Sequence, residues 1–162
     1  MRRITPLATL AIGLSLLGMV SQATAQEATP VTTGNAETFT LVERALNVTV
    51  VDVGEAGPSA GDITVWGPDP LFDEANETDT GAVTQGSCMA LNENYDNHCT
   101  ETVLFPDGST IAIQGVQLGN GGPSVTTIVG GSGRYLGATG TVTVTASEDE
   151  TLWTKVFEVV ID

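Results

Sequence analysis

The sequence predicts an all-β fold, an eight-stranded antiparallel barrel that closes on itself. Short runs of β-branched residues recur between turn signals at fairly even spacing, and several alternate apolar with polar residues. The composition is rich in Gly and Thr, with 19 Gly, and lacks the amphipathic stripe of a helix. Eight alternating strands without helices form either a sandwich or a closed barrel, and closure removes exposed edges. These patterns alone do not exclude the sandwich, which remains the alternative.

Composition excludes several classes of function. The chain has 162 residues, with 20 acidic and 5 basic side chains, one His and a net charge of −15. Nucleic acid and anionic membranes are poor partners for such a chain. One His and two Cys cannot build a multi-histidine site or a four-sulfur cage, so we expect no metal. We expect no cofactor either.

The N-terminus predicts export. Residues 1–25 combine a basic start, an apolar run and a small-residue end, which is the pattern of a secretory signal peptide with cleavage after Ala25. A membrane anchor is the alternative, but the apolar run is short and contains Pro6. Residues 26–36 read as a disordered leader and 37–162 as the domain. We therefore expect a secreted protein with no membrane attachment after cleavage.

The strands follow in order along the domain. The first run is long enough to bend, and a Pro-Asp-Pro sequence at 68–70 is expected to end the second. Pro106-Asp107-Gly108 is a tight-turn sequence, so it predicts a hairpin between the fourth and fifth strands. The predicted strands are Thr38–Asp52, Gly61–Gly67, Thr80–Leu91, Cys99–Phe105, Ser109–Leu118, Ser124–Gly130, Thr139–Ser147 and Thr151–Asp162.

Alternation assigns faces within these strands. In the fifth strand Ile111 and Ile113 lie opposite Gln114, because successive side chains of a strand point to opposite faces. In the last strand Lys155 shares a face with Trp153 and Phe157.

Two cysteines flank a polar hairpin tip. Cys88 and Cys99 are predicted to form a disulfide, the default state of a cysteine pair in an exported protein. The bond would join two neighbouring strands. A reactive thiol pair is the alternative, but only His98 is close enough to stabilise a thiolate. We interpret His98 as a solvated loop residue.

Several segments carry a family resemblance. The sequence Ile128–Gly140, IVGGSGRYLGATG, is the most specific, and Leu41-Val42-Glu43, Gly86-Ser87-Cys88 and Phe105–Ile111 add to it. Together they resemble the allene oxide cyclase-like and dirigent-like barrel superfamily, particularly its secreted bacterial members. The resemblance covers Thr38 to Asp162.

The resemblance implies an eight-stranded barrel with a central cavity. Relatives cyclise an unstable fatty-acid epoxide, steer the coupling of phenoxy radicals or shape polyketide cyclisations. Activity in this chain would then be that of a cofactor-independent cyclase or isomerase acting by confinement of its substrate. The resemblance assigns no catalytic residue, so whether the chain is an enzyme stays open.

The glycine-rich segment 130–140 is not a nucleotide-binding loop. It has no third glycine at the required spacing, no phosphate-binding lysine and no helix after it. We interpret it as a tight corner at one end of the barrel, with Tyr135 as the plug.

Candidate ligand-binding residues are polar or aromatic side chains within the predicted strands. Arg44 would either anchor a ligand carboxylate or lie outside against the acidic surface. An acidic run at residues 69–79 is a solvated loop or, alternatively, a calcium site. The candidates for ligand contact are Glu43, Arg44, Trp66, Glu101, Gln114 and Trp153.

Three functions follow from these expectations. The first is a secreted barrel that binds a small apolar ligand and guides its cyclisation or coupling. The alternative is a non-catalytic extracellular module with a packed interior, and a surface domain that binds sugar or calcium ranks last. We expect a monomer or a small homo-oligomer, since the acidic surface limits interfaces.

Overall fold

The computed structural model describes residues 34–54 and 56–161, so the predicted signal peptide and most of the leader lie outside the described part. The described residues form nine strands and one 3₁₀ turn, η1 (Gly133–Tyr135). The strands are β1 (Asn35–Arg44), β2 (Val48–Val51), β3 (Ile63–Phe72), β4 (Asp79–Ala90), β5 (Asn97–Leu104), β6 (Thr110–Gln117), β7 (Ser124–Ser132), β8 (Thr139–Ala146) and β9 (Leu152–Ile161).

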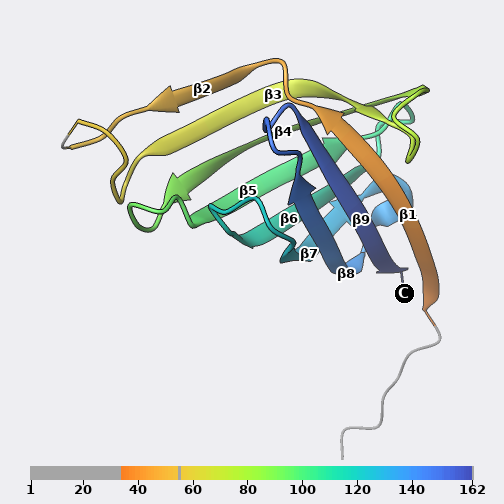
Figure 1. Ribbon diagram of the computed structural model, residues 1–162. Coiled ribbons are helices and arrows are strands. Elements are labelled where there is room, and N and C mark those ends of the chain that lie inside the picture. The colour runs from red at the N-terminus through yellow and green to blue at the C-terminus, as the bar shows by residue number, and fades with distance from the viewer. Residues whose placement is uncertain (1–33, 55, 162) are drawn as a thin grey trace, which may run out of the picture. The chain divides into compact units, whose positions relative to one another are not determined.

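Eight of these strands close into an antiparallel barrel, as predicted (Figure 1). The sheet runs in the order β1-β9-β8-β7-β6-β5-β4-β3-β2, and β1 also pairs with β3. That last pairing, of Val42 with Phe72 and Glu43 with Leu71, completes the ring. β2 remains outside the ring as a ninth strand on the edge of β3.

The first two predicted strands differ from the structure. The single run Thr38–Asp52 is two strands, because the chain leaves β1 after Arg44 and crosses to β3 as β2. β3 continues past its predicted end to Phe72, through both prolines. Prolines lack an N–H donor, and here they lie between the part of β3 that pairs with β2 and the part that pairs with β1.

β1 also begins earlier than the predicted domain start. Asn35 and Ala36 pair with Ile161 and Val160 of β9, so the end of the predicted leader is part of the barrel. The other predicted strands agree with β4 to β9 within two residues at either end, over the described residues.

One half of the barrel interior is packed with apolar side chains. Phe39 stacks on Phe157 with ring centroids 4.7 Å apart, and Phe105 and Tyr135 pack beside them. Tyr135 is 1% exposed, which confirms its predicted role as a plug at the glycine-rich corner. None of the described residues forms a helix that is long and apolar enough to cross a membrane.

Candidate functional site

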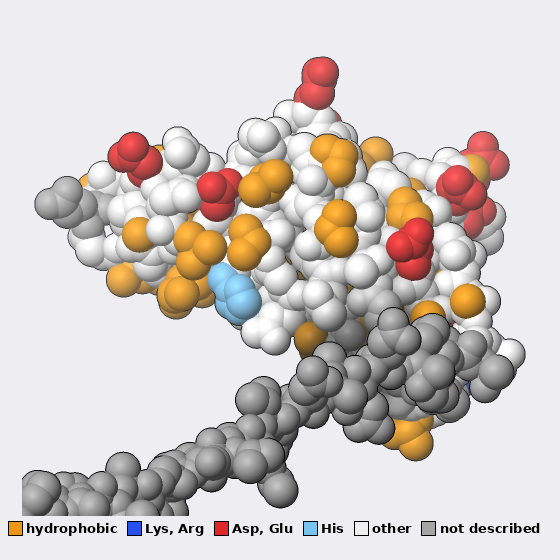
Figure 2. Space-filling view, turned by 90° about the horizontal axis from the view of Figure 1, so that it is seen from below, with side chains coloured by type: hydrophobic (Ala, Val, Ile, Leu, Met, Phe, Trp, Pro, Cys, Tyr) orange, Lys and Arg blue, Asp and Glu red, His pale blue; other side chains and the backbone are white. Residues whose placement is uncertain are grey.

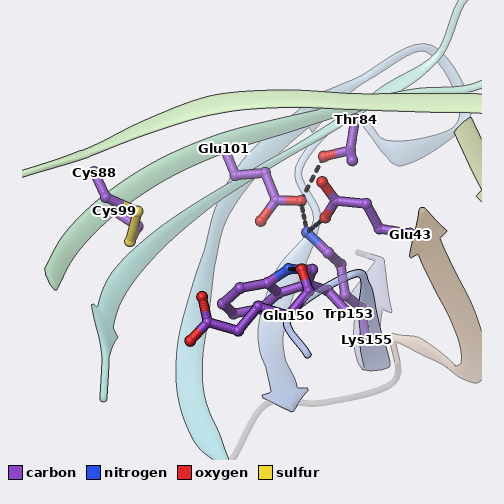
Figure 3. A network of polar contacts seen from close by, with 8 residues as sticks. All are labelled: Glu43, Thr84, Cys88, Cys99, Glu101, Glu150, Trp153 and Lys155. Atoms are coloured by element: carbon purple, nitrogen blue, oxygen red, sulfur yellow. Dashed lines mark hydrogen bonds and ion pairs between the residues drawn. A yellow bond between two sulfur atoms is a disulfide. The ribbon is translucent and has the colours of Figure 1, made fainter. Parts of the chain in front are cut away.

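The other half of the barrel interior holds a cluster of charged side chains (Figure 3). Lys155 of β9 reaches inward between Glu43 of β1 and Glu101 of β5. Its Nζ lies 2.8 Å from Glu43 Oε2 and also forms an ion pair with Glu101 Oε1. Thr84 of β4 donates a hydrogen bond to the same Glu101 oxygen. Four strands therefore contribute to one polar cluster.

All three charges are removed from solvent. Lys155 is 2% exposed, and Glu43 and Glu101 are each 4% exposed. Burial raises the pKa of Glu43, an effect that Lys155 opposes and Glu101 adds to. Burial by itself would lower the pKa of Lys155, but the two carboxylates outweigh it and raise that pKa. Lys155 is thus held as a cation, whereas Glu43 holds a proton more tightly than an exposed glutamate.

A cavity of about 410 Å³ opens above this cluster. Glu43 and Lys155 form its floor, and side chains from β2, from β3 and from the loops β4–β5, β6–β7 and β8–β9 form its walls and rim. The aromatic lining residues are Trp66, Tyr95 and Trp153. The cavity therefore combines apolar walls with a buried polar floor, as in most small-molecule sites.

Local contacts hold the aromatic walls in position. The Trp66 ring covers Gly86 on the paired strand β4, where a Cβ atom would meet the ring. Trp153 donates its indole N–H to the backbone carbonyl of Glu150, 3.1 Å away. The Tyr95 hydroxyl donates to Asp62, which also accepts backbone hydrogen bonds that lower its pKa.

Three of the six predicted ligand-binding residues line this cavity, and a fourth lies next to it. Glu43, Trp66 and Trp153 line it, and Glu101 lies directly behind the floor. Arg44 is on the opposite face of β1, with its guanidinium 3.4 Å from the Phe72 ring centroid.

Gln114 is also remote from the cavity. It is exposed on the outer face of β6, where its Nε2 lies 3.0 Å from the Nε2 of His98. Contrary to the loop prediction, His98 is a residue of β5.

Lys155 is a site residue that the sequence prediction missed. The signal for it was present, since a lysine on the apolar face of a strand needs buried counter-charges. Nothing in the sequence spacing identified Glu43 and Glu101 as those partners. Glu43 is on β1, which pairs with β9 although the two strands lie at opposite ends of the sequence, and Glu101 on β5 reaches Lys155 only across the barrel.

The predicted disulfide is present. Cys88 of β4 and Cys99 of β5 are paired directly across the hairpin and are bonded to each other, and Cys88 lines the cavity. The acidic residues of the run 69–79 do not form a metal site. No group of three or more His, Cys, Asp or Glu within the described residues is placed to hold a metal ion. Asp69 instead accepts hydrogen bonds from Asn47, and Asp73 from the backbone of Glu77 and Thr78.

Comparison with known proteins places this geometry in a family. Residues 42–157 match the family model described as the allene oxide cyclase barrel like domain. No curated protein matches the chain at the sequence level.

Three solved structures are similar in fold. A pyocyanin demethylase is 22% identical, with a TM-score of 0.65 over 75% of this chain and 99% of that one. A pterocarpan synthase dirigent protein is 17% identical, with a TM-score of 0.66 over 79% and 86%. A Diels Alderase from Streptomyces koyangensis is 15% identical, with a TM-score of 0.61 over 80% and 70%.

At these identities the solved structures establish only the fold. The family model, by contrast, spans more than two thirds of the sequence and includes both Glu43 and Lys155. The chain belongs to the allene oxide cyclase barrel-like family.

Proposed function

We propose that this protein is an exported barrel that binds a small, largely apolar molecule in the cavity above Glu43 and Lys155. The observation that carries the proposal is the cavity of about 410 Å³, with two tryptophans in its lining and a buried ion pair as its floor. Ligand pockets in proteins usually measure about 300–1,000 Å³ and pair apolar walls with a few polar groups.

The floor suits reactions that proceed by proton transfer. Glu43 lies on the cavity surface and binds its proton more tightly than an exposed glutamate does, while Lys155 stabilises the carboxylate that remains after the proton leaves. Glu43 would give a proton to a basic atom of the substrate and take one back from carbon or oxygen later. The net reaction is then an isomerisation or cyclisation without a cofactor.

The comparisons support small-molecule chemistry of this kind. The similar structures include proteins named as a demethylase of pyocyanin, a pterocarpan synthase and a Diels Alderase. Confinement of a flexible substrate in one productive conformation needs little beyond a shaped cavity, so this chain requires no further group for such a role.

Native mass spectrometry of the protein secreted by its own producer tests ligand binding. We expect a co-purifying small molecule that dissociates on unfolding. Val50→Trp fills the cavity, since Val50 lines it, and this variant should lose the molecule. Val51→Trp is the matched control, because Val51 is the next residue of β2 and is exposed without lining the cavity.

Retention of the molecule by Val50→Trp would place the ligand elsewhere. An empty protein, combined with failure to bind any of a panel of apolar compounds, would favour the structural module instead. The same spectra test export, because a mature chain that begins at Gln26 is expected after signal cleavage. A full-length chain in the medium would contradict the cleavage prediction.

A further inference from the structure

The charged residues of the cavity are unevenly divided. Glu43, Glu93 and Glu150 line it, and Lys155 is the one basic side chain in the lining. A fourth carboxylate, Glu101, lies behind Lys155 and pairs with it. With Glu43 as the proton carrier proposed above, three carboxylates still share one ammonium group, which leaves the site with an excess of negative charge.

That ammonium group is not available to a ligand. Lys155 is fully enclosed and is already paired with two carboxylates. The other two basic residues in the described part of the chain are remote from the cavity. Arg44 donates to Asn76 on the outside of the barrel, and Arg134 pairs with Asp107 at the packed end. A ligand carboxylate would find no counter-charge here.

Two further observations favour a cation. Trp66, Tyr95 and Trp153 line the same cavity, and the faces of such rings attract organic cations. Glu101 Oε2 is buried without a hydrogen-bond partner among the described residues, and in Figure 3 it faces away from Lys155. Glu101 does not itself line the cavity, so this oxygen favours a cation through its negative charge behind the floor and not by direct contact with a ligand.

We propose that the ligand of this cavity is an organic cation, such as a protonated amine or an N-alkylated aromatic heterocycle. The proposal rests on the function proposed above and names the class of molecule that the cavity takes. It also replaces the expectation that Arg44 anchors a ligand carboxylate, since that side chain is outside the barrel.

Isothermal titration with three probes of the same size tests this choice. Naphthylmethylammonium, naphthylmethanol and naphthoate share one ring system, and their one-carbon substituents carry a positive charge, no charge and a negative charge. At pH 7 and low salt we expect the ammonium probe to bind about tenfold tighter than the alcohol. The carboxylate should bind most weakly, and added salt should reduce the preference for the cation.

Two rim variants and a matched control assign the preference to this cavity. Glu93→Gln and Glu150→Gln remove exposed carboxylates that line the rim, so neither should impair folding. Each should weaken the binding of the ammonium probe about threefold or more and leave the binding of the alcohol unchanged. Glu148→Gln removes an exposed carboxylate from the same β8–β9 turn that does not line the cavity, and it should change neither.

The outcomes separate the two proposals. Equal binding of alcohol and ammonium, or tighter binding of naphthoate, would overturn the cation inference while the ligand barrel stands. Equal losses in Glu148→Gln and Glu150→Gln would show a general surface-charge effect and overturn it as well. If none of the three probes binds, both the cation inference and the proposed function fail.

Discussion

The buried charge cluster is the feature on which the site depends at the scale of single residues. Two carboxylates and one ammonium group lose nearly all contact with water, and each loss of hydration is unfavourable by several kcal/mol. Pairing offsets this only while every partner is present. This barrel has such a cluster in its interior, beside a cavity, although apolar side chains of similar volume would stabilise the fold equally well.

Removal of the lysine should therefore destabilise the protein strongly. Lys155→Met leaves Glu43 and Glu101 buried without a counter-charge, and we expect a loss of about 3–5 kcal/mol in the free energy of unfolding. Urea denaturation measures it, with Thr154→Met on the outer face of β9 as the control. Adding Glu43→Gln and Glu101→Gln to Lys155→Met should recover most of the loss. If it does not, the lost contacts of Lys155 are those of packing and not of charge.

Glu43 should give stability an unusual dependence on pH. Its pKa in the folded state is raised above 4.5, so the folded protein binds this proton more tightly than the unfolded chain does. The stabilisation is complete below the unfolded pKa and is lost as pH rises through the folded pKa. Subtracting the unfolding free energy of Glu43→Gln from that of the wild type isolates the contribution of Glu43, because the aspartates whose pKa is lowered contribute equally to both.

We expect that difference, measured in urea from pH 4 upward, to fall as pH rises past about 4.5 and then to level off. The contribution of Asp73 to stability changes with pH in the opposite direction, because its pKa is lowered, first of all by the backbone N–H of Glu77. The stabilising effect of Asp73 appears as pH rises and is lost on acidification. A difference that grows with pH would mean that the ionised form of Glu43 is the one the fold favours.

Strand alternation explains which site residues the sequence could predict. Glu43 and Arg44 are neighbours in one strand, so only one of the two can face the interior. Glu43 shares its face with Leu41 of the apolar core, which leaves Arg44 outside. Gln114 is excluded in the same way by Ile111 and Ile113. Alternation could have selected Glu43 and Lys155, but only the pairing of β1 with β9, at opposite ends of the sequence, shows that they touch.

At the scale of elements, the departure of β2 from the barrel creates the site. β1 ends at Arg44, and the chain crosses to β3, so Val48 and Val50 become a wall of the cavity. Asn47 fixes this crossing through hydrogen bonds to Asp69 and to the carbonyl of Pro68. The sequence shows one continuous β-rich run from Thr38 to Asp52, with no glycine or proline to mark the crossing.

The β4–β5 hairpin should depend on its disulfide. Replacing Cys88 and Cys99 together by serine frees a loop that the bond closes in the unfolded chain, with a sequence separation of 11. We expect a loss of about 2–4 kcal/mol in the free energy of unfolding. Urea denaturation under oxidising conditions measures it, and wild type with reductant should match the double variant. Equal stability of wild type and variant would show that the disulfide does not restrict the unfolded chain beyond what pairing within the hairpin already does.

At the scale of the whole barrel, the interior divides along its axis. Along β9 the inward side chains run from Trp153 at the cavity, through Lys155, to Phe157 and Val159 in the packed half. The eight β-rich runs and the hairpin at Pro106-Asp107-Gly108 followed from local patterns in the sequence, and the antiparallel barrel from the family resemblance. The cavity did not, because its volume depends on which side chains meet across the barrel.

The acidic surface should make stability rise with salt. The full chain carries a net charge of −15, and acidic side chains recur across the face shown in Figure 2. Mutual repulsion of these charges destabilises the folded state, and added ions screen it, with a Debye length of about 30 Å at 0.01 M and about 3 Å at 1 M. The free energy of unfolding in urea should therefore increase from low to high NaCl.

KCl at equal ionic strength should give the same increase, because screening does not distinguish the two cations. The buried pair of Lys155 and Glu43 is shielded from these ions, so Glu43→Gln should show the same salt response as the wild type. A fall in stability with salt would mean that attractive ion pairs, and not repulsion, dominate the surface of this barrel.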